Sequence, residues 1–180
     1  NRCRRQRQMC IRDSDYIVVV GGDGFMLDIL KKYQKYKKPF YGINTGKRGF
    51  LLNKYSNGNL KSKINQASKI YLFPLEAKIK THNITKKIIA INEVSVFRQS
   101  KQTTQLQINL NKKIKIKELV GDGILVATPA GSTAYNLSAK GPILNLESQY
   151  LAVTPISPFK PRGWKGCLLY TSDAADDTCC

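Results

Sequence analysis

Cysteine is absent from residues 11–166, and all five cysteines of the chain lie in its two flanks. An odd number of cysteines without metal-ligand spacing fits neither a disulfide framework nor a zinc site. The chain has no run of eighteen apolar residues, so no membrane-spanning helix is expected. The apolar run IVVV at 17–20 is too short for a signal peptide. We therefore expect a globular, cytoplasmic protein without a membrane partner.

Acidic residues are also scarce in this sequence. It has 12 acidic and 30 basic side chains, and its formal net charge is +18 at pH 7. Such a balance favours polyanionic partners such as nucleotides, polyphosphate, nucleic acid or acidic membrane surfaces. The alternative is compositional drift in an AT-rich genome, because lysine, isoleucine and asparagine are all abundant and only KKYQKYKK at 31–38 forms a lysine cluster. Composition alone leaves both explanations open.

The composition changes abruptly at both ends of the chain. Five of the eight arginines lie in the first twelve residues, and no basic residue follows Gly166. The segments QMCIRDS at 8–14 and CLLYTSDAADD at 167–177 resemble translated library-adapter sequence. We therefore predict that residues 1–14 and 167–180 are not native and carry no function.

Residues 15–70 alternate between strand and helix patterns. The apolar run that ends in glycines, DYIVVVGGDG at 15–24, is typical of a buried strand in a parallel sheet. Apolar residues at helical spacing predict a helix over 25–36. A second strand at 40–44 and a weaker helix at 59–70 follow. This order predicts an α/β domain over residues 15–70.

From residue 71 onward, apolar and polar residues alternate in the manner of β-strands. No convincing helix is found in residues 71–166, which we expect to form a β domain. The expected strands lie at 86–97, 106–110 and 114–116, on both sides of the glycine turn at 121–123, and at 150–159, with a hairpin turn at Asn111 and Lys112.

The turn GGDG at 21–24 lies between the first strand and the first helix. Glycines allow backbone N–H groups to approach a phosphate closely, and a helix N-terminus favours negative charge. Asp23 would lie at the carboxyl end of a strand, where open α/β sheets bind ligands. An aspartate there can accept a proton from an attacking hydroxyl or hold Mg²⁺. The alternative is a tight turn that requires glycine for steric reasons alone.

Asn92 and Glu93 interrupt the apolar pattern of the strand expected at 86–97. Neighbouring side chains of a strand point to opposite faces, and burying an amide or a carboxylate without a partner is costly. The two residues therefore indicate either a ligand-binding pair or a bulge or strand end in solvent.

The stretch TPAGSTAYNLSAKGP at 128–142 has no regular apolar period. A loop of this length in a compact domain is usually functional or disordered, and its content is not that of a disordered linker. Ser132, Thr133 and Ser138 offer hydroxyl groups, and Tyr135 offers a flat ring. These groups suit a nucleoside, through stacking and hydrogen bonds to base and ribose.

In this order and at these intervals, GGDG, NE and GDGxxVxTPxGSTAYxxSxxGP resemble the NAD kinase family. The resemblance covers about residues 15–166 and includes GINTGKRGFL at 42–51 and TPISPFKPRGW at 154–164. The GSTAY element is the specific part, because phosphofructokinases and diacylglycerol-type lipid kinases share GGDG. The resemblance implies a Rossmann-like, phosphofructokinase-like α/β N-terminal domain and an all-β C-terminal β-sandwich domain. Family chains extend further at both ends, so we expect a truncated chain.

The resemblance also implies an activity. The family transfers the γ-phosphoryl group of ATP, or in some members of polyphosphate, to the 2′-hydroxyl of the adenosine ribose of NAD⁺, which gives NADP⁺. Mg²⁺ or another divalent cation is the implied cofactor, and no residue of this chain is assigned to a metal. The implied partners are NAD and ATP, and the full-length protein is expected to form a homodimer or homotetramer whose nucleotide site can borrow residues from a neighbouring subunit. No specific nucleic acid is expected.

The resemblance assigns a role to several positions. Asp23 matches the general base for the attacking hydroxyl, and Gly24 matches part of the phosphate-binding turn. Asn92 and Glu93 match the pair that grips the NAD ribose and adenine, and Asp122 matches the acid at the nicotinamide-side ribose. The remaining contacts, near the adenine, match Phe50, Thr133, Ala134, Tyr135 and Ser138.

Three positions depart from the family pattern. Phe25 follows GGDG, as in some bacterial members, whereas the family usually has threonine there. Val120 lies two residues before the second aspartate, where the family often has a basic or polar residue, which leaves one NAD contact unassigned. Lys140 lies where the loop usually has glycine. Two alternatives stay open: a diacylglycerol-type lipid kinase, which shares GGDG but should lack GSTAY, and a non-catalytic nucleotide-binding fragment.

Overall fold

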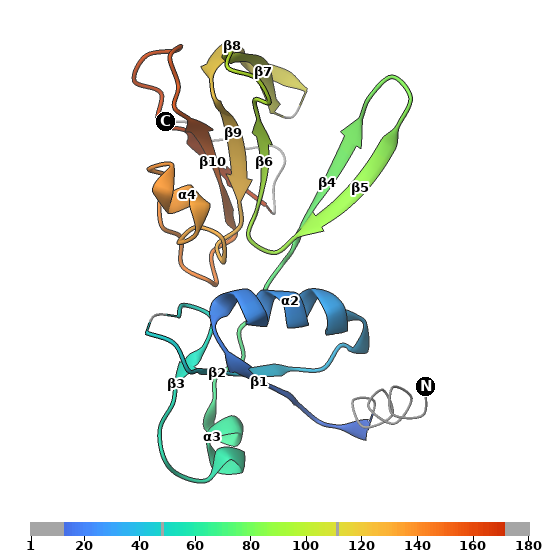
Figure 1. Ribbon diagram of the computed structural model, residues 1–180, viewed down its shortest axis with the longest axis vertical. Coiled ribbons are helices and arrows are strands. Elements are labelled where there is room, and N and C mark those ends of the chain that lie inside the picture. Colours follow the sequence, from blue (N-terminus) through green and yellow to red (C-terminus); the bar gives the residue numbers. More distant parts are fainter. Residues whose placement is uncertain (1–12, 48, 111, 172–180) are drawn as a thin grey trace. The chain divides into compact units, whose positions relative to one another are not determined.

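The computed structural model describes residues 13–47, 49–110 and 112–171 of the chain (Figure 1). The chain divides between Lys69 and Ile70 into two compact units, the N-terminal unit and the C-terminal unit. No helix within the described ranges is both long and apolar enough to cross a membrane.

The N-terminal unit contains a three-stranded parallel sheet with the order β1-β2-β3. Its first two strands pair from Ile17 opposite Phe40 to Gly21 opposite Asn44. The elements are β1 (Ile17–Gly21), α2 (Asp23–Tyr33), the 3-10 helix η1 (Gln34–Tyr36), β2 (Phe40–Asn44), β3 (Asn53–Lys54) and α3 (Leu60–Gln66). Figure 1 shows α2 and α3 on opposite sides of this sheet.

The two faces of this sheet are buried to different extents. Val19 of β1 is 2% exposed, and Met26 of α2 is 6% exposed. Burying an apolar side chain of this size stabilises the fold by about 1.5–3 kcal/mol. Val18 and Val20 point to the other face, because side chains alternate along a strand, and they are 40% and 55% exposed. The face that carries α2 therefore forms the better-packed half of the unit.

The ends of the helices follow local sequence signals. Lys31 and Lys32 lie in the last turn of α2, where positive charge complements the helix dipole. Lys37 ends η1 in the left-handed conformation, with φ 51°. The side chain of Asn59 caps α3 by accepting the Lys61 N–H at 2.9 Å. These local signals account for the C-terminal ends of α2 and η1 and for the start of α3.

The C-terminal unit is built almost entirely of strands. Its main sheet is antiparallel with the order β11-β10-β9-β6, and two hairpins, β4-β5 and β7-β8, accompany it. The elements are β4 (Leu75–Lys80), β5 (Thr85–Ala90), β6 (Glu93–Phe97), β7 (Thr104–Leu110), β8 (Lys113–Gly121), β9 (Gly123–Ala127), α4 (Tyr135–Ser138), β10 (Tyr150–Ile156) and β11 (Cys167–Tyr170).

The two central strands of the main sheet, β9 and β10, are buried on both faces. On one face, Leu125 and Ala152 are fully buried, and Leu144 from the segment after α4 packs against them. On the other face, Ile124 and Val153 pack with Leu119 and with further apolar residues of the β7-β8 hairpin. The hairpin and the loop that contains α4 therefore cover opposite sides of one sheet.

The predicted fold class, an α/β domain followed by an all-β domain, is confirmed. Two details of the prediction are wrong. The strand expected at 86–97 is two strands, because the chain leaves the β4-β5 hairpin after Ala90 and enters the main sheet at Glu93. The loop at 128–142 contains a short helix, α4, which is closed by bonds such as Ala139 N–H to Tyr135 O at 2.9 Å.

Some predictions lie partly outside the described residues. Asn111 of the expected hairpin turn lies outside the described residues, whereas Lys112 is described and has a φ of 65°. Residues 1–12 and 172–180 of the flanks are also outside the described ranges. Residues 167–170 form β11, which pairs with β10.

Candidate functional site

Asp23 lies at the carboxyl end of β1, as the first residue of α2. Its Oδ2 accepts the Phe50 N–H at 2.7 Å, and its Oδ1 accepts the Leu51 N–H at 3.1 Å. The carboxylate therefore holds the loop after β2 against the end of β1. Each carboxylate oxygen has more than one acceptor position, so Asp23 can still accept a proton or a hydrogen bond from a ligand.

Gly22 and Gly24 flank this aspartate and face open space. A Cβ added to either glycine would meet no atom within 4 Å, and neither has a positive φ. Gly24 is the second residue of α2, where alanine would favour the helix by about 0.5–1 kcal/mol. The steric explanation for these glycines therefore finds no support in the packing, whereas open space beside the first N–H groups of a helix suits a phosphate.

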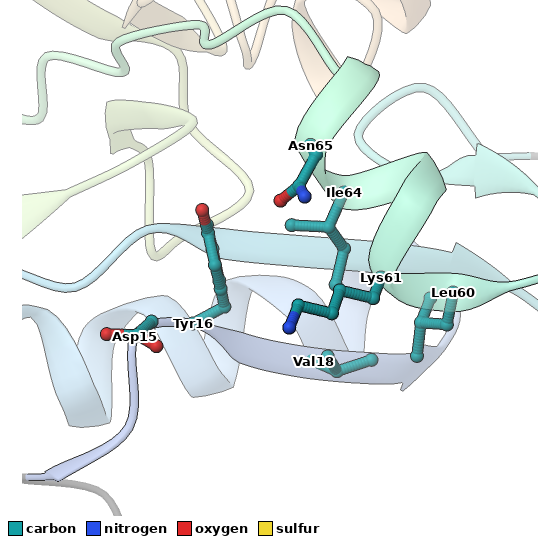
Figure 2. A pocket seen from close by; sticks show the side chains of 7 residues that line it. All are labelled: Asp15, Tyr16, Val18, Leu60, Lys61, Ile64 and Asn65. Carbon is teal, nitrogen blue, oxygen red and sulfur yellow. The ribbon is translucent and has the colours of Figure 1, made fainter.

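A pocket in the N-terminal unit lies away from this turn. Figure 2 shows it between β1 and α3, with a volume of about 490 Å³. The side chains that line it are Asp15, Tyr16, Val18, Leu60, Lys61, Ile64 and Asn65. Val18 points away from α2, so the pocket lies on the more open face of the sheet and does not include Asp23.

Asn92 ends the connection from β5, and Glu93 is the first residue of β6. The Oδ1 atom of Asn92 is buried and accepts no hydrogen bond from any residue in the described ranges, and the Oε2 atom of Glu93 is also buried. An unsatisfied buried acceptor costs about 1–3 kcal/mol. A ligand that donated a hydrogen bond to Asn92 Oδ1 would recover this free energy.

The start of the 128–142 loop is fixed against Asn92. Thr128 donates its N–H to the Asn92 carbonyl at 2.8 Å and its hydroxyl to the Ile91 carbonyl at 2.5 Å. A Cβ at Gly131 would lie 2.2 Å from the Asn92 carbonyl oxygen, so only glycine fits there. The start of the loop therefore lies directly against the backbone of Asn92.

Asn136 holds the rest of the loop, a role that the sequence analysis missed. It is fully buried, and its Nδ2 donates to the Ser132 carbonyl at 3.2 Å and to the Pro142 carbonyl at 2.8 Å. Its Oδ1 accepts the Thr154 hydroxyl of β10 at 2.7 Å. The only sequence signal was an amide among small residues, and its partner on β10 is too distant in sequence to be recognised.

The loop residues expected near the adenine differ in accessibility. Tyr135 is 43% exposed and Ser138 is exposed, whereas Thr133 and Ala134 are half-buried. Ser132 is fully buried, and its hydroxyl donates to the Pro129 carbonyl at 2.7 Å. Ser132 is therefore part of the scaffold and does not offer a free hydroxyl. In the N-terminal unit, Phe50 is 61% exposed.

Asp122 lies at the opposite end of β6 from the NE pair. β6 and β9 pair from Glu93 opposite Ala127 to Phe97 opposite Gly123, and Asp122 directly precedes Gly123. Four strand positions correspond to about 13 Å. The structure therefore brings the NE pair and the GSTAY loop together within one chain but does not bring Asp122 to them.

In this chain, a unit with a strand, a glycine turn and a helix precedes a β-rich unit whose loop is held by buried polar residues. The family model of the ATP-NAD kinase N-terminal domain matches residues 2–71, and that of the ATP-NAD kinase C-terminal domain matches residues 91–163. The chain belongs to the NAD kinase family.

Relatives and solved structures agree with this assignment. The NAD kinase of Brucella suis biovar 1 (strain 1330) is 48% identical over 166 residues, and that of Rhizobium meliloti (strain 1021) is 51% identical over 157 residues. These matches cover 92% and 87% of this chain but only 65% and 61% of the relatives, so the chain spans less than two thirds of their length. None of these matches supports a lipid kinase.

Two solved structures share the fold. An NAD kinase from Archaeoglobus fulgidus in complex with ATP has a TM-score of 0.68 and 31% identity, over 88% of this chain and 62% of its own. Yeast NADH kinase complexed with NADH has a TM-score of 0.68 and 26% identity, over 87% of this chain and 48% of its own.

Proposed function

We propose that this chain is the site-bearing part of a phosphotransferase that moves the γ-phosphoryl group of ATP to the 2′-hydroxyl of the adenosine ribose of NAD⁺, which gives NADP⁺. The observation that carries this proposal is the buried Oδ1 of Asn92, which has no donor within the described ranges. A ribose hydroxyl or an adenine amino group would supply that donor. Membership of the NAD kinase family supports this proposal.

In the N-terminal unit, which we assign to residues 15–70, Asp23 is the proposed general base. Its two backbone donors fix the direction of the carboxylate, so that it can take the proton of the attacking hydroxyl. Gly22 and Gly24 leave room for the phosphates at the start of α2, where the helix dipole favours negative charge. Phosphoryl transfer depends mainly on such positioning.

In the C-terminal unit, which we assign to residues 71–166, Asn92 and Glu93 are the proposed ribose and adenine contacts. The exposed ring of Tyr135 is the proposed stacking surface for the adenine, on a loop whose start Thr128 and Gly131 hold against Asn92. Thr133, Ala134, Ser138 and, in the N-terminal unit, Phe50 are the further proposed nucleotide contacts.

ATP is the proposed phosphoryl donor because a relative of the same fold is solved with ATP, and polyphosphate is the alternative. Mg²⁺ is proposed as the accompanying cation. The described residues contain no group of three or more His, Cys, Asp or Glu side chains that could hold a metal. In this proposal Mg²⁺ is held mainly by the triphosphate and water, as is usual for nucleotide-bound Mg²⁺.

The test is NADP⁺ formation by this chain with NAD⁺, ATP and Mg²⁺, compared between wild type, Asp23→Asn and the matched control Asp28→Asn. Asp28 lies on the same helix and is exposed, so its substitution changes the charge equally without touching the turn. We expect Asp23→Asn to lower turnover at least a hundredfold, the range of a lost general base, and Asp28→Asn to leave it unchanged. Full turnover in Asp23→Asn would refute the assigned base, and NAD⁺ binding without turnover would favour a non-catalytic fragment.

The position of Asp122 supports an oligomer in which it serves a neighbouring copy. We also propose that the enzyme is cytoplasmic. Within one chain, only a dinucleotide extended along β6 would touch both Asp122 and the NE pair. Mixing Asn92→Ala chains with Asp122→Ala chains separates the two cases. Activity regained in the mixture means that the mixed oligomers contain an intact composite site, and a mixture as inactive as its parts means that both residues act in the same chain.

A further inference from the structure

Arg98, which directly follows β6, forms an ion pair with Asp122. Its Nε donates to Asp122 Oδ1 at 2.6 Å, and the two side chains are 30% and 27% exposed. The other ion pairs within the described ranges, Lys87–Glu76 and Lys160–Glu118, have side chains that are 41–61% exposed. The Arg98–Asp122 pair is therefore the least solvated of the three, and its electrostatic interaction is the least screened.

The backbone holds both partners in place. Arg98 donates its N–H to the Asp122 carbonyl at 2.9 Å, and Asp122 donates its N–H to the Ile156 carbonyl at 2.9 Å. The next residue, Gly123, is pressed against β6, because a Cβ there would lie 2.1 Å from the Val96 carbonyl oxygen. Asp122 is therefore bonded on both sides, and the pair occupies a rigid turn rather than a mobile loop.

The pair leaves one donor group and one acceptor atom unused. Arg98 Nη1 donates to the Ser100 carbonyl, whereas Nη2 has no hydrogen-bond partner in the described part of the chain. Asp122 Oδ2 likewise accepts no hydrogen bond from the described residues. A guanidinium N–H beside a carboxylate oxygen matches a vicinal diol, in which one hydroxyl donates to the carboxylate and the other accepts from the guanidinium.

We propose that Arg98 is a second ligand contact of the nucleotide site, which orients Asp122 and donates from Nη2 to a ribose diol of the dinucleotide. This inference rests on the proposed function. It also accounts for Val120, the apolar residue two positions before Asp122, because Arg98 brings a cation to this turn from a different strand. Lysine cannot replace it fully, since only the planar fork of arginine binds Asp122 and the ligand at once.

The test compares wild type with Arg98→Gln, Arg98→Lys and the control Lys87→Gln. The control removes the same charge and breaks an exposed ion pair far from Asp122 in sequence. NAD⁺ affinity is measured by calorimetry, and the KM values for NAD⁺ and ATP by NADP⁺ formation. We expect Arg98→Gln to weaken NAD⁺ binding about tenfold, the effect of one charge-assisted hydrogen bond, with the KM for ATP unchanged. Arg98→Lys should fall between wild type and Arg98→Gln, and Lys87→Gln should match wild type.

An NMR measurement tests the pair without depending on turnover. The Arg98 Nε–H resonance should be resolved in the free wild-type protein and should shift in Asp122→Asn. An unchanged resonance would refute the pair itself. Wild-type NAD⁺ affinity in a folded Arg98→Gln variant would refute the ligand contact while leaving the proposed function intact. Failure of the wild-type chain to bind NAD⁺ at all would instead refute the proposed function, and this inference with it.

Discussion

Lys140 shows how a single backbone angle can explain a departure in sequence. It follows the turn that ends α4, and its φ is 64°, in the left-handed region. L-residues other than glycine are strained there by about 1–2 kcal/mol, which accounts for the glycine that the family usually has at this position. The side chain is exposed, so nothing in the packing requires lysine.

We expect Lys140→Gly to raise the free energy of unfolding by about 0.5–1 kcal/mol, because relief of the strained angle exceeds the greater chain entropy of glycine. Urea unfolding measures this difference. Lys115→Gly is the control, since Lys115 is an exposed residue inside β8 and glycine should destabilise a strand there. Equal destabilisation by both substitutions would contradict the explanation.

Asn136 shows what sequence patterns leave hidden. An α/β half followed by a β-rich half was predictable from apolar periodicity and glycine placement, because these signals are local. The GGDG, NE and GSTAY stretches also stood out locally, and their roles stay predictions. The hydrogen bond that holds the loop to the sheet was not predictable, since its donor, Thr154, lies on β10 and comes close only in the folded chain. Arg98 escaped prediction for the same reason.

Asn136→Ala should lower the free energy of unfolding by about 2–4 kcal/mol, because it leaves several buried polar groups without partners. Urea unfolding measures the loss, and Asn109→Ala, at an exposed position of β7, should cost less than about 0.5 kcal/mol. A double-mutant cycle with Thr154→Val should show coupling, since the two side chains share a hydrogen bond. Additive effects would mean that the hydrogen bond between Asn136 and Thr154 does not stabilise the fold.

Among the helices, α2 has a first turn that is not optimised for stability. Gly24 faces open space, so Gly24→Ala should stabilise the N-terminal unit by about 0.5–1 kcal/mol. The same methyl group would occupy the space proposed for phosphate. We therefore expect the variant to melt at a higher temperature while the KM for ATP rises at least tenfold. A variant that is more stable and equally active would refute the phosphate site at this turn.

For the molecule as a whole, β11 completes the edge of the main sheet. It pairs with β10 from Tyr150 opposite Tyr170 to Val153 opposite Cys167, and the two tyrosine rings lie 5.0 Å apart. Strands pair through hydrogen bonds between backbone groups, so segments of different sequence can form this edge strand. This explains how residues that resemble adapter sequence can adopt a regular strand.

Removal of residues 167–180 should therefore change the association state before it changes the fold. β10 would become an edge strand, and its residues Ala152–Ile156 are almost fully buried in the intact chain. Long apolar edges pair with other chains. Light scattering should show concentration-dependent aggregation of the truncated chain, and a monomer that stays clear at high concentration would contradict this expectation.

The same strand has a consequence for protein production. β10 is synthesised before β11, so the apolar edge of β10 stays open until β11 has also left the ribosome and paired with it. The C-terminal unit should thus be exposed to aggregation during translation and refolding, even where the finished protein is stable. A solubilising partner fused to the N-terminus, which can fold before this edge is made, should then raise the yield of soluble protein.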